Sequence, residues 1–312
     1  MSLHLSSAPH VHSRQVTWVL MLHVLIALIP CVAAGIWYFG YSALILMAIS
    51  TGTAVLAEFA WQKLTGKKVL IGDLSAAVTG LIMGLNLPPR APWWIAVVGS
   101  LFAIIIVKCL FGGLGDNFMN PALAARAVLL ASWPVRMTTW FAPTGWNSYA
   151  ADAVTAATPL ASPSNFTRLD LLLGRVPGTI GEVCKVAILI GLIYLLITQT
   201  ITWRIPVIMV ASTFAFSWLF GKDPVDAILS GGLLFAAVFM ATDYVTSPMT
   251  ANGQYIYAFG CGLMVALIRS YGNYPEGATY AILIMNIATP LIDRFTKHRV
   301  YGHRKEAKKQ NA

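Results

Sequence analysis

The sequence has little charge. Of its 312 residues, 11% are charged and 57% are hydrophobic, and the mean hydropathy is +0.70. A water-soluble domain carries about twice that share of charged residues. The composition therefore excludes an ordinary soluble domain and predicts a protein that crosses a membrane several times.

Cysteine motifs are also missing. The four cysteines, Cys31, Cys109, Cys184 and Cys261, form no Cys-x-x-Cys pair, and each lies in or beside an apolar run. We expect them to be small buried side chains, and we expect no metal site. Thiols that are distant in sequence leave an iron–sulfur centre open, although their spacing does not favour one.

The familiar catalytic motifs are absent as well. There is no His-Glu-x-x-His, no Ser-His-Asp set and no zinc-ligand cluster, and the histidines lie mostly near the two ends. The glycine-rich stretch 112–117 follows an apolar span and lacks the Gly-Lys-Ser/Thr ending of a phosphate loop, so we expect no nucleotide site there. The polar stretch up to Gln15 has no small-residue cleavage site, so we expect no removable signal peptide. We assign no catalytic side chain.

Positive charge is concentrated at one end. The net charge is +9, and seven of the 21 lysines and arginines fall between Arg294 and Lys309. Such a terminal cluster is typical of a cytoplasmic tail beside membrane lipid, and its position argues against a nucleic-acid partner.

Ten apolar spans follow one another along the chain. Crossing the hydrocarbon layer takes about 20 helical residues, so we predict an all-α polytopic membrane protein with about ten transmembrane helices. Four of the spans are short, which suggests helices that are tilted, broken or extended by a half-helix. The predicted spans are 16–38, 42–61, 74–88, 92–111, 121–133, 181–201, 205–220, 226–242, 254–270 and 276–294.

The basic residues predict the orientation. With the N-terminus inside, the inner segments receive the basic tail together with Arg14, Lys63, Lys67, Lys68 and Arg204. The inverted orientation would place the tail outside, against the positive-inside rule. We therefore predict that both termini are cytoplasmic and that the long segment 133–180 is extracytoplasmic.

A weak internal repeat divides the chain. Asp73-Leu74-Ser75 and a following Thr-Gly pair resemble Asp226-Ala227-Ile228 and a following Ser-Gly pair. Each half holds five spans, so the halves run in opposite directions and form an inverted repeat. The predicted units are residues 1–132, the loop 133–180, residues 181–295 and the tail 296–312. Chance similarity among apolar segments is the alternative.

Several ionisable residues lie within or at the ends of spans, where charge is expensive and by default suggests function. Asp73 and Asp226 occupy matching positions in the two repeats. They are interpreted either as helix N-caps, a usual place for aspartate, or as part of an ion or flavin pathway. The others are Glu58, Lys108, Asp116, Arg126, Asp243 and Asp293.

The long polar loop contains the spacing Asp-x-x-Thr-x-Ala-Thr, formed by Asp152, Thr155, Ala157 and Thr158. Its hydroxyls have small neighbours, and the following proline disfavours helix at Thr158. Such a threonine can carry a covalently attached flavin. An ordinary serine- and threonine-rich loop is the alternative.

Longer stretches carry a family resemblance over nearly the whole chain. They include Ile71-Gly72-Asp73, Phe111-Gly112-Gly113-Leu114-Gly115, Asn120-Pro121-Ala122, 152–160, Thr242-Asp243, 267–277, 289–293 and 299–305. Together they resemble the NqrB/RnfD family, which contains a membrane subunit of the Rnf ion-translocating electron-transport complex and its relative in the sodium-translocating NADH:quinone reductase.

The resemblance implies a flavoprotein. In that family the last threonine of the motif, here Thr158, is esterified to the phosphate of FMN by an extracytoplasmic flavin transferase of the ApbE type, which makes the chain a phosphoprotein. Thr155 is the less favoured attachment point. Relatives are also thought to hold a non-covalent riboflavin within the membrane part, for which spacing assigns no residues.

The resemblance also implies the physiological setting. We expect a component of an inner-membrane translocase that couples reduced ferredoxin and NAD to Na⁺ or H⁺ transport, with the A, B, C, E and G subunits of the Rnf complex as partners. A quinone-reductase component is one alternative, and a passive channel or secondary transporter is another.

Side chains near the motif are candidate contacts of the flavin ring. Aromatic residues can stack on the ring or form an interfacial belt, and arginines can stabilise a reduced anionic flavin. The candidates are Trp140, Phe141, Trp146, Tyr149, Arg168 and Arg175.

Overall fold

The computed structural model describes residues 16–143, 166–272 and 277–296, and within these ranges every regular element is helical. The first half of the chain begins with two long helices joined at Gly40, whose φ of 68° permits the tight reversal. Its elements are α1 (Thr17–Phe39), α2 (Tyr41–Leu64), η1 (Ile71–Asp73), α3 (Ser75–Leu85), α4 (Trp93–Leu101), the π-helical η2 (Phe102–Cys109), α5 (Pro121–Ser132) and α6 (Pro134–Thr138).

The second half combines short helices of six or seven residues with longer ones. Several of these helices have an N-cap side chain, such as Thr167 before α7 and Thr250 before α12. Each side-chain oxygen accepts a backbone N–H of the first turn and so stabilises the start of the helix. The elements are α7 (Arg168–Leu173), α8 (Lys185–Ile197), α9 (Arg204–Leu219), α10 (Pro224–Leu229), α11 (Leu233–Phe239), α12 (Ala251–Tyr271) and α13 (Gly277–Thr296).

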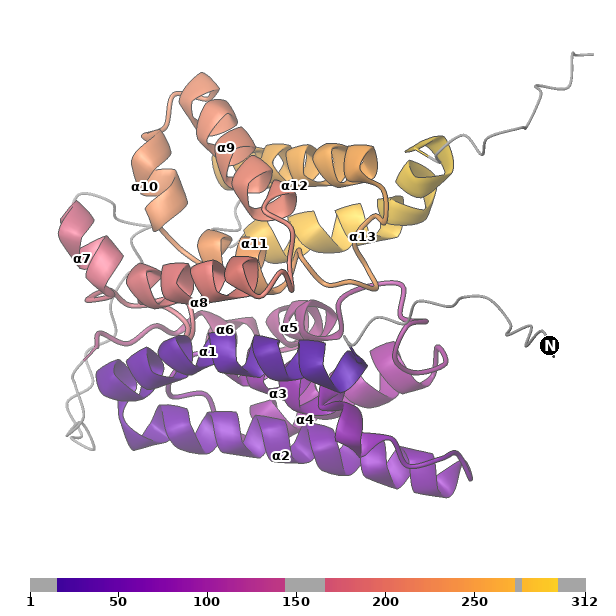
Figure 1. Ribbon diagram of the computed structural model, residues 1–312. Helices are drawn as coiled ribbons and strands as arrows, with labels where there is room; N and C mark the ends of the chain where they lie inside the picture. The colour runs from indigo at the N-terminus through magenta and orange to yellow at the C-terminus, as the bar shows by residue number, and fades with distance from the viewer. Residues whose placement is uncertain (1–15, 144–165, 273–276, 297–312) are drawn as a thin grey trace, which may run out of the picture.

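The two halves form two layers (Figure 1). Helices α1 to α6 make one layer and α7 to α13 the other. The layers meet where α1 packs on α8 and α5 packs on α13. The larger apolar core runs through both layers, and a smaller second one around Ala54 and Ile104 lies within the first layer. Short helices from both halves, among them α3, α5 and α11, therefore end close to the plane between the layers.

The outer surface is apolar, as expected for a protein in lipid. Large side chains such as Ile29, Trp37 and Leu56 are exposed on the long helices. Three described helices are long and apolar enough to cross a membrane by length and composition: α1, α2 and α12. An all-α membrane protein is therefore supported, whereas ten crossings remain a prediction.

The longer helices overlap the spans predicted from hydropathy and differ from them by a few residues at their ends, whereas η1, α6 and α7 lie outside the predicted spans. The span 226–242 is interrupted: α10 ends at Leu229, α11 begins at Leu233, and Ser230, Gly231 and Gly232 lie between them. Gly231 has a φ of 65°, a conformation that side-chain-bearing residues rarely adopt, so the chain turns out of the helix there.

Small residues allow close packing of α3 on α2. A Cβ at Gly80 of α3 would lie 2.7 Å from Cβ of Ala54 and 2.8 Å from Cα of Thr51, both on α2. The interpretation of the cysteines is confirmed. All four are free, Cys31, Cys109 and Cys261 are buried, and Cys184 is half-buried.

Candidate functional site

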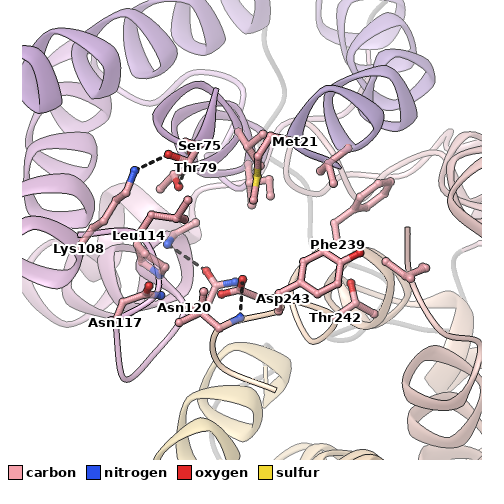
Figure 2. Close-up of a pocket in the computed structure, with 18 of the residues that line it drawn as sticks. Met21, Ser75, Thr79, Lys108, Leu114, Asn117, Asn120, Phe239, Thr242 and Asp243 are labelled. Atoms are coloured by element: carbon pink, nitrogen blue, oxygen red, sulfur yellow. Dashed lines mark hydrogen bonds between the residues drawn. The ribbon is translucent and has the colours of Figure 1, made fainter. Parts of the chain in front are cut away.

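A cavity lies between the two layers (Figure 2). It measures about 90 Å³, and both halves contribute to its wall. Lys108 and Ser75 lie on one side of it, and Phe239 with Thr242 on another. The lining is mostly apolar with a few polar groups, among them Ser75, Thr79, Lys108, Asn117, Asn120, Thr242 and Asp243.

Asn120 joins the two halves at this cavity. Its Oδ1 accepts the backbone N–H groups of Ala122 and Leu123 at 3.0 and 3.2 Å and so caps α5, with Pro121 at the first helical position. Its Nδ2 donates to the carbonyl oxygen of Met240, just after α11, at 3.2 Å. One buried amide therefore fixes the start of α5 against the end of α11.

Asp243 lies on the same wall, beyond the end of α11. Its carboxylate accepts the backbone N–H of Val245 at 3.4 Å and the hydroxyl of Thr246 at 3.1 Å. These local bonds hold the carboxylate in the turn that follows α11. The cavity therefore has one carboxylate, one ammonium and several amide or hydroxyl groups around an apolar interior.

Beside the cavity is a group that we call the Lys108 cluster: Glu58, Gln62, Asp73, Ser75 and Lys108. Lys108 and Glu58 are 2% and 3% exposed. The Lys108 ammonium donates to the two carboxylate oxygens of Glu58 at 2.9 and 2.8 Å and to Oγ of Ser75 at 2.6 Å. The buried positive charge is thus directly paired with a carboxylate, which a buried ion requires.

Local backbone geometry positions this cluster. Lys108 belongs to the π-helical η2, a form of helix often found at functional sites. Leu74, between η1 and α3, has a φ of 62°, which is rare for a side-chain-bearing residue. Asp73 then accepts both the backbone N–H and the hydroxyl of Ser75, at 2.9 and 2.6 Å. A second cavity of about 420 Å³ adjoins Glu58 and Asp73 and includes Lys67 and Lys68.

The second half has its own buried charged group, the Lys185 cluster: Glu182, Lys185, Ser230, Gly231, Gly232 and Arg269. Lys185 and Glu182 are 2% and 4% exposed. The Lys185 ammonium donates to the carbonyl oxygens of Glu182 and Gly231, the latter at 2.9 Å. Arg269 donates to the carbonyl oxygen of Ser230 at 3.3 Å and to that of Ala227 at 2.6 Å. Both cations therefore contact the break between α10 and α11.

The segment before α8 brings Glu182 to this break. The backbone N–H groups of Ile180 and Gly181 donate to the carbonyls of Leu87 and Leu85, beyond and at the end of α3. Glu182 then accepts the backbone N–H of Thr179 at 2.9 Å. Its other carboxylate oxygen occupies the space that a Cβ at Gly232 would need. A side chain at position 232 would therefore displace the carboxylate from the break.

The predicted site residues lie in separate places. Asp152, Thr155, Ala157 and Thr158 fall outside the described residues, as do Trp146 and Tyr149. Asp73 belongs to the Lys108 cluster. The N-cap residue of α3 is Leu74, one position later, although the carboxylate of Asp73 accepts the backbone N–H of Ser75, the first residue of α3. Asp226 is not near Asp73 in the described contacts, and its interpretation as an N-cap is wrong.

The cap of α10 is Asp223. Its carboxylate accepts the backbone N–H groups of Val225 and Asp226, because Pro224 takes the first helical position. Asp226 instead lies 3.7 Å from Nε of Arg168, whose Nη2 is 3.0 Å from Asp223. These ion pairs connect α7 to α10 on the exposed surface.

The other ring-contact candidates are partly placed. Trp140 is buried, and the guanidinium of Arg90 lies 5.2 Å from the ring centre of Phe141. Phe141 and α7 therefore hold the chain against the helical body on either side of residues 144–165. Arg168 is engaged by the two aspartates of α10.

Glu182 and Lys185 were missed by sequence reasoning. A signal was present, because two charged residues stand at the start of the apolar span 181–201, where charge is unfavourable. Asn117 and Asn120 were noticed only within longer motifs. Their role around a shared cavity depends on contacts between halves that are distant in sequence.

Comparisons with known proteins agree with the resemblance. Residues 4–302 match the model of the NQR2, RnfD, RnfE family. The chain is 50% identical to the D subunit of the Na⁺-translocating ferredoxin:NAD⁺ oxidoreductase complex of Acetobacterium woodii, over 100% of this chain and 99% of the relative. It is 40% identical to the proton-translocating counterpart of Clostridium ljungdahlii, over 96% of each chain. It is 38% identical to the D subunit of the ion-translocating oxidoreductase complex of Halorhodospira halophila, over 96% and 95%.

Proposed function

The chain belongs to the NQR2, RnfD, RnfE family, and we propose that it is the D subunit, a membrane component, of an ion-translocating ferredoxin:NAD⁺ oxidoreductase complex. The observation that carries this proposal is the 50% identity over the full length to a relative of that name. The names of the relatives differ in the transported ion, which is Na⁺ in one and H⁺ in another. They therefore support coupling of electron transfer to ion transport but do not identify the ion.

Electron transfer requires a cofactor, and we propose FMN esterified to Thr158. The support is the Asp-x-x-Thr-x-Ala-Thr spacing together with the family membership. A phosphoester leaves the isoalloxazine ring free to accept electrons, while the protein supplies position and electrostatics. In the described residues, Phe141 with Arg90 precedes the segment that carries the motif, and α7 follows it.

A second, non-covalent flavin such as riboflavin belongs to the same proposal, with family membership as its support. The cavity between the halves offers apolar walls with Asn117, Asn120 and Thr242 at its edge. Its volume of about 90 Å³ is well below the roughly 300–1,000 Å³ of a usual cofactor pocket. The described residues therefore do not assign the riboflavin to this cavity.

We further propose ten transmembrane helices in two inverted repeats. Each half has a basic side chain that reaches its interrupted helix region: Lys108 bonds to Ser75, and Arg269 bonds to the carbonyl of Ser230. Both termini would be cytoplasmic in a bacterial inner membrane, with residues 133–180 outside, where an ApbE-type transferase acts. The A, B, C, E and G subunits of the Rnf complex would supply the ferredoxin and NAD sites.

Flavin fluorescence on a denaturing gel tests the covalent cofactor. Protein made in cells with the transferase should give a fluorescent band, which should vanish in Thr158→Ala and survive in the matched variant Thr155→Ala. A dark wild-type band contradicts the proposal. Fluorescence that survives in Thr158→Ala and vanishes in Thr155→Ala moves the attachment point to the other hydroxyl.

A further inference from the structure

The cavity of about 420 Å³ beside the Lys108 cluster is not used by the proposed flavin chemistry. Its volume falls within the roughly 300–1,000 Å³ of a usual ligand pocket, unlike that of the smaller cavity between the layers. Its wall combines apolar side chains with charged ones. The charged side chains that line it are Glu58, Lys67, Lys68 and Asp73.

The turn after α2 brings the two lysines to this cavity. Gly66, with a φ of 65°, reverses the chain at the end of the helix. The backbone N–H of Lys67 donates to the carbonyl of Gln62 at 2.9 Å, as in a Schellman motif. The buried amide of Gln62 in turn accepts the backbone N–H of Leu70 at 2.9 Å. The basic turn is therefore fixed by a helix-ending motif and by one buried side chain.

The wall has a small excess of positive charge. Lys108 is paired with Glu58 and neutralises it. In the described part of the chain, no carboxylate oxygen lies within 4.0 Å of the ammonium group of Lys67 or Lys68. Two lysines against Asp73 leave one net positive charge, which complements an anion that carries a single negative charge. Two charged residues adjacent to lining residues have opposite signs: Lys63 and Asp116.

Large apolar side chains lie beside the lysines. Leu70 and Leu114 line the cavity and are 60% and 41% exposed, and Leu64, at the end of α2, is 85% exposed. Trp61 also lines the cavity, near the end of α2, where interfacial aromatics are common. A soluble phosphate would leave these leucines uncovered, whereas a phospholipid has acyl chains to cover them. Basic pockets beside transmembrane helices bind the headgroups of anionic lipids.

We propose that this cavity binds the headgroup of an anionic phospholipid with one net negative charge, such as phosphatidylglycerol. The phosphate lies between the ammonium groups of Lys67 and Lys68, and the acyl chains run along Leu70 and Leu114. The site is independent of Thr158, so flavin fluorescence tests the proposed function separately.

Thermal unfolding of the purified full-length chain in detergent micelles tests the site. The midpoint is measured with phosphatidylglycerol, with phosphatidylcholine, which has no net charge, and with inorganic phosphate, which has no acyl chains. We expect phosphatidylglycerol to raise the wild-type midpoint by about 3 °C or more, because it binds the folded state, and the other two additives to leave the midpoint unchanged. An equal rise with inorganic phosphate would make this a site for soluble anions, and an equal rise with phosphatidylcholine would show no choice of headgroup. Either result would overturn the proposal.

Two double variants separate this cavity from a general attraction between anionic lipid and a basic protein. Lys67→Gln/Lys68→Gln should lose most of the rise, and it should fold like the wild type because both side chains are exposed. Arg136→Gln/Lys222→Gln removes two exposed basic charges that do not line the cavity, and it should keep the rise. A rise that persists in Lys67→Gln/Lys68→Gln, or an equal loss in both double variants, would contradict a site between these two lysines.

Discussion

Lys108 and Lys185 are both 2% exposed, yet their ammonium groups have different partners. Lys108 touches the carboxylate of Glu58 and the hydroxyl of Ser75. Lys185 touches two backbone carbonyls at a helix break, and Glu182 balances its charge from further away. A directly paired carboxylate neutralises the Lys108 charge, whereas Lys185 is stabilised chiefly by backbone dipoles. The comparison therefore separates two ways of keeping a buried lysine, one in each half.

The largest loss of stability is expected when the ion pair between Lys108 and Glu58 is broken. Lys108→Gln leaves the Glu58 carboxylate buried without its partner, so we expect a loss of about 3–5 kcal/mol of unfolding free energy. Lys185→Gln leaves no directly paired carboxylate, and its amide still donates to carbonyls, so we expect a loss of about 1–3 kcal/mol. Thermal unfolding of the two variants side by side measures the difference.

The double variant Lys108→Gln/Glu58→Gln provides the control for that experiment. Removing both charges should recover a large part of the loss, because no buried ion is left unpaired. Equal losses for Lys108→Gln and Lys185→Gln would contradict the distinction between the two lysines.

A smaller effect is expected at the break itself. Gly232→Ala places a methyl group where the Glu182 carboxylate lies, so the carboxylate must shift and we expect a loss of about 1–3 kcal/mol. Gly72→Ala is the matched control, because a Cβ there meets nothing within 4 Å and we expect little change. If both variants unfold at the same temperature, Glu182 is not fixed against the break.

Breaking the exposed ion pair of Arg168 and Asp223 should cause the smallest loss of stability in this comparison. Their side chains are 61% and 45% exposed, so water screens the pair and Arg168→Gln should lower the unfolding free energy by about 0–1 kcal/mol. The effect should shrink further in high salt. A loss as large as that of Lys108→Gln would show that exposure does not explain the ranking.

The same pair predicts a pH dependence. The backbone N–H groups of Asp226 and Val225, followed by Arg168, lower the pKa of Asp223 below its usual value. Its contribution to stability is therefore present above the unfolded-state pKa and is lost as the pH falls through the lower folded-state pKa. Asp223→Asn should remove this acid-side loss, as measured by unfolding in a series of acidic buffers.

Much of the helical layout follows from the sequence. Apolar spans must form helices in lipid because their backbone groups need internal hydrogen bonds, and glycines such as Gly80 permit close packing. The sequence could not locate the break at Ser230 to Gly232 or bring Glu182 to it. That arrangement depends on hydrogen bonds from Ile180 and Gly181 to the end of α3, which is distant along the chain.

The error at Asp226 has a local cause. Its match to Asp73 in the repeat favoured the same role, but Pro224 fixes the first turn of α10 and makes Asp223 the cap. The cavity could not be predicted from the sequence either, because Asn120 and Asp243 come from different halves. Only the packing of α5 against α13 and the position of α11 bring them to one wall.

Peptide mapping by mass spectrometry tests the central claim, that this chain carries electrons through a covalent flavin. Protein purified with its transferase present should yield a peptide spanning Asp152 to Pro159 whose mass is increased by FMN less one water, with the modification on Thr158. An unmodified Thr158 in protein from such cells would contradict the account.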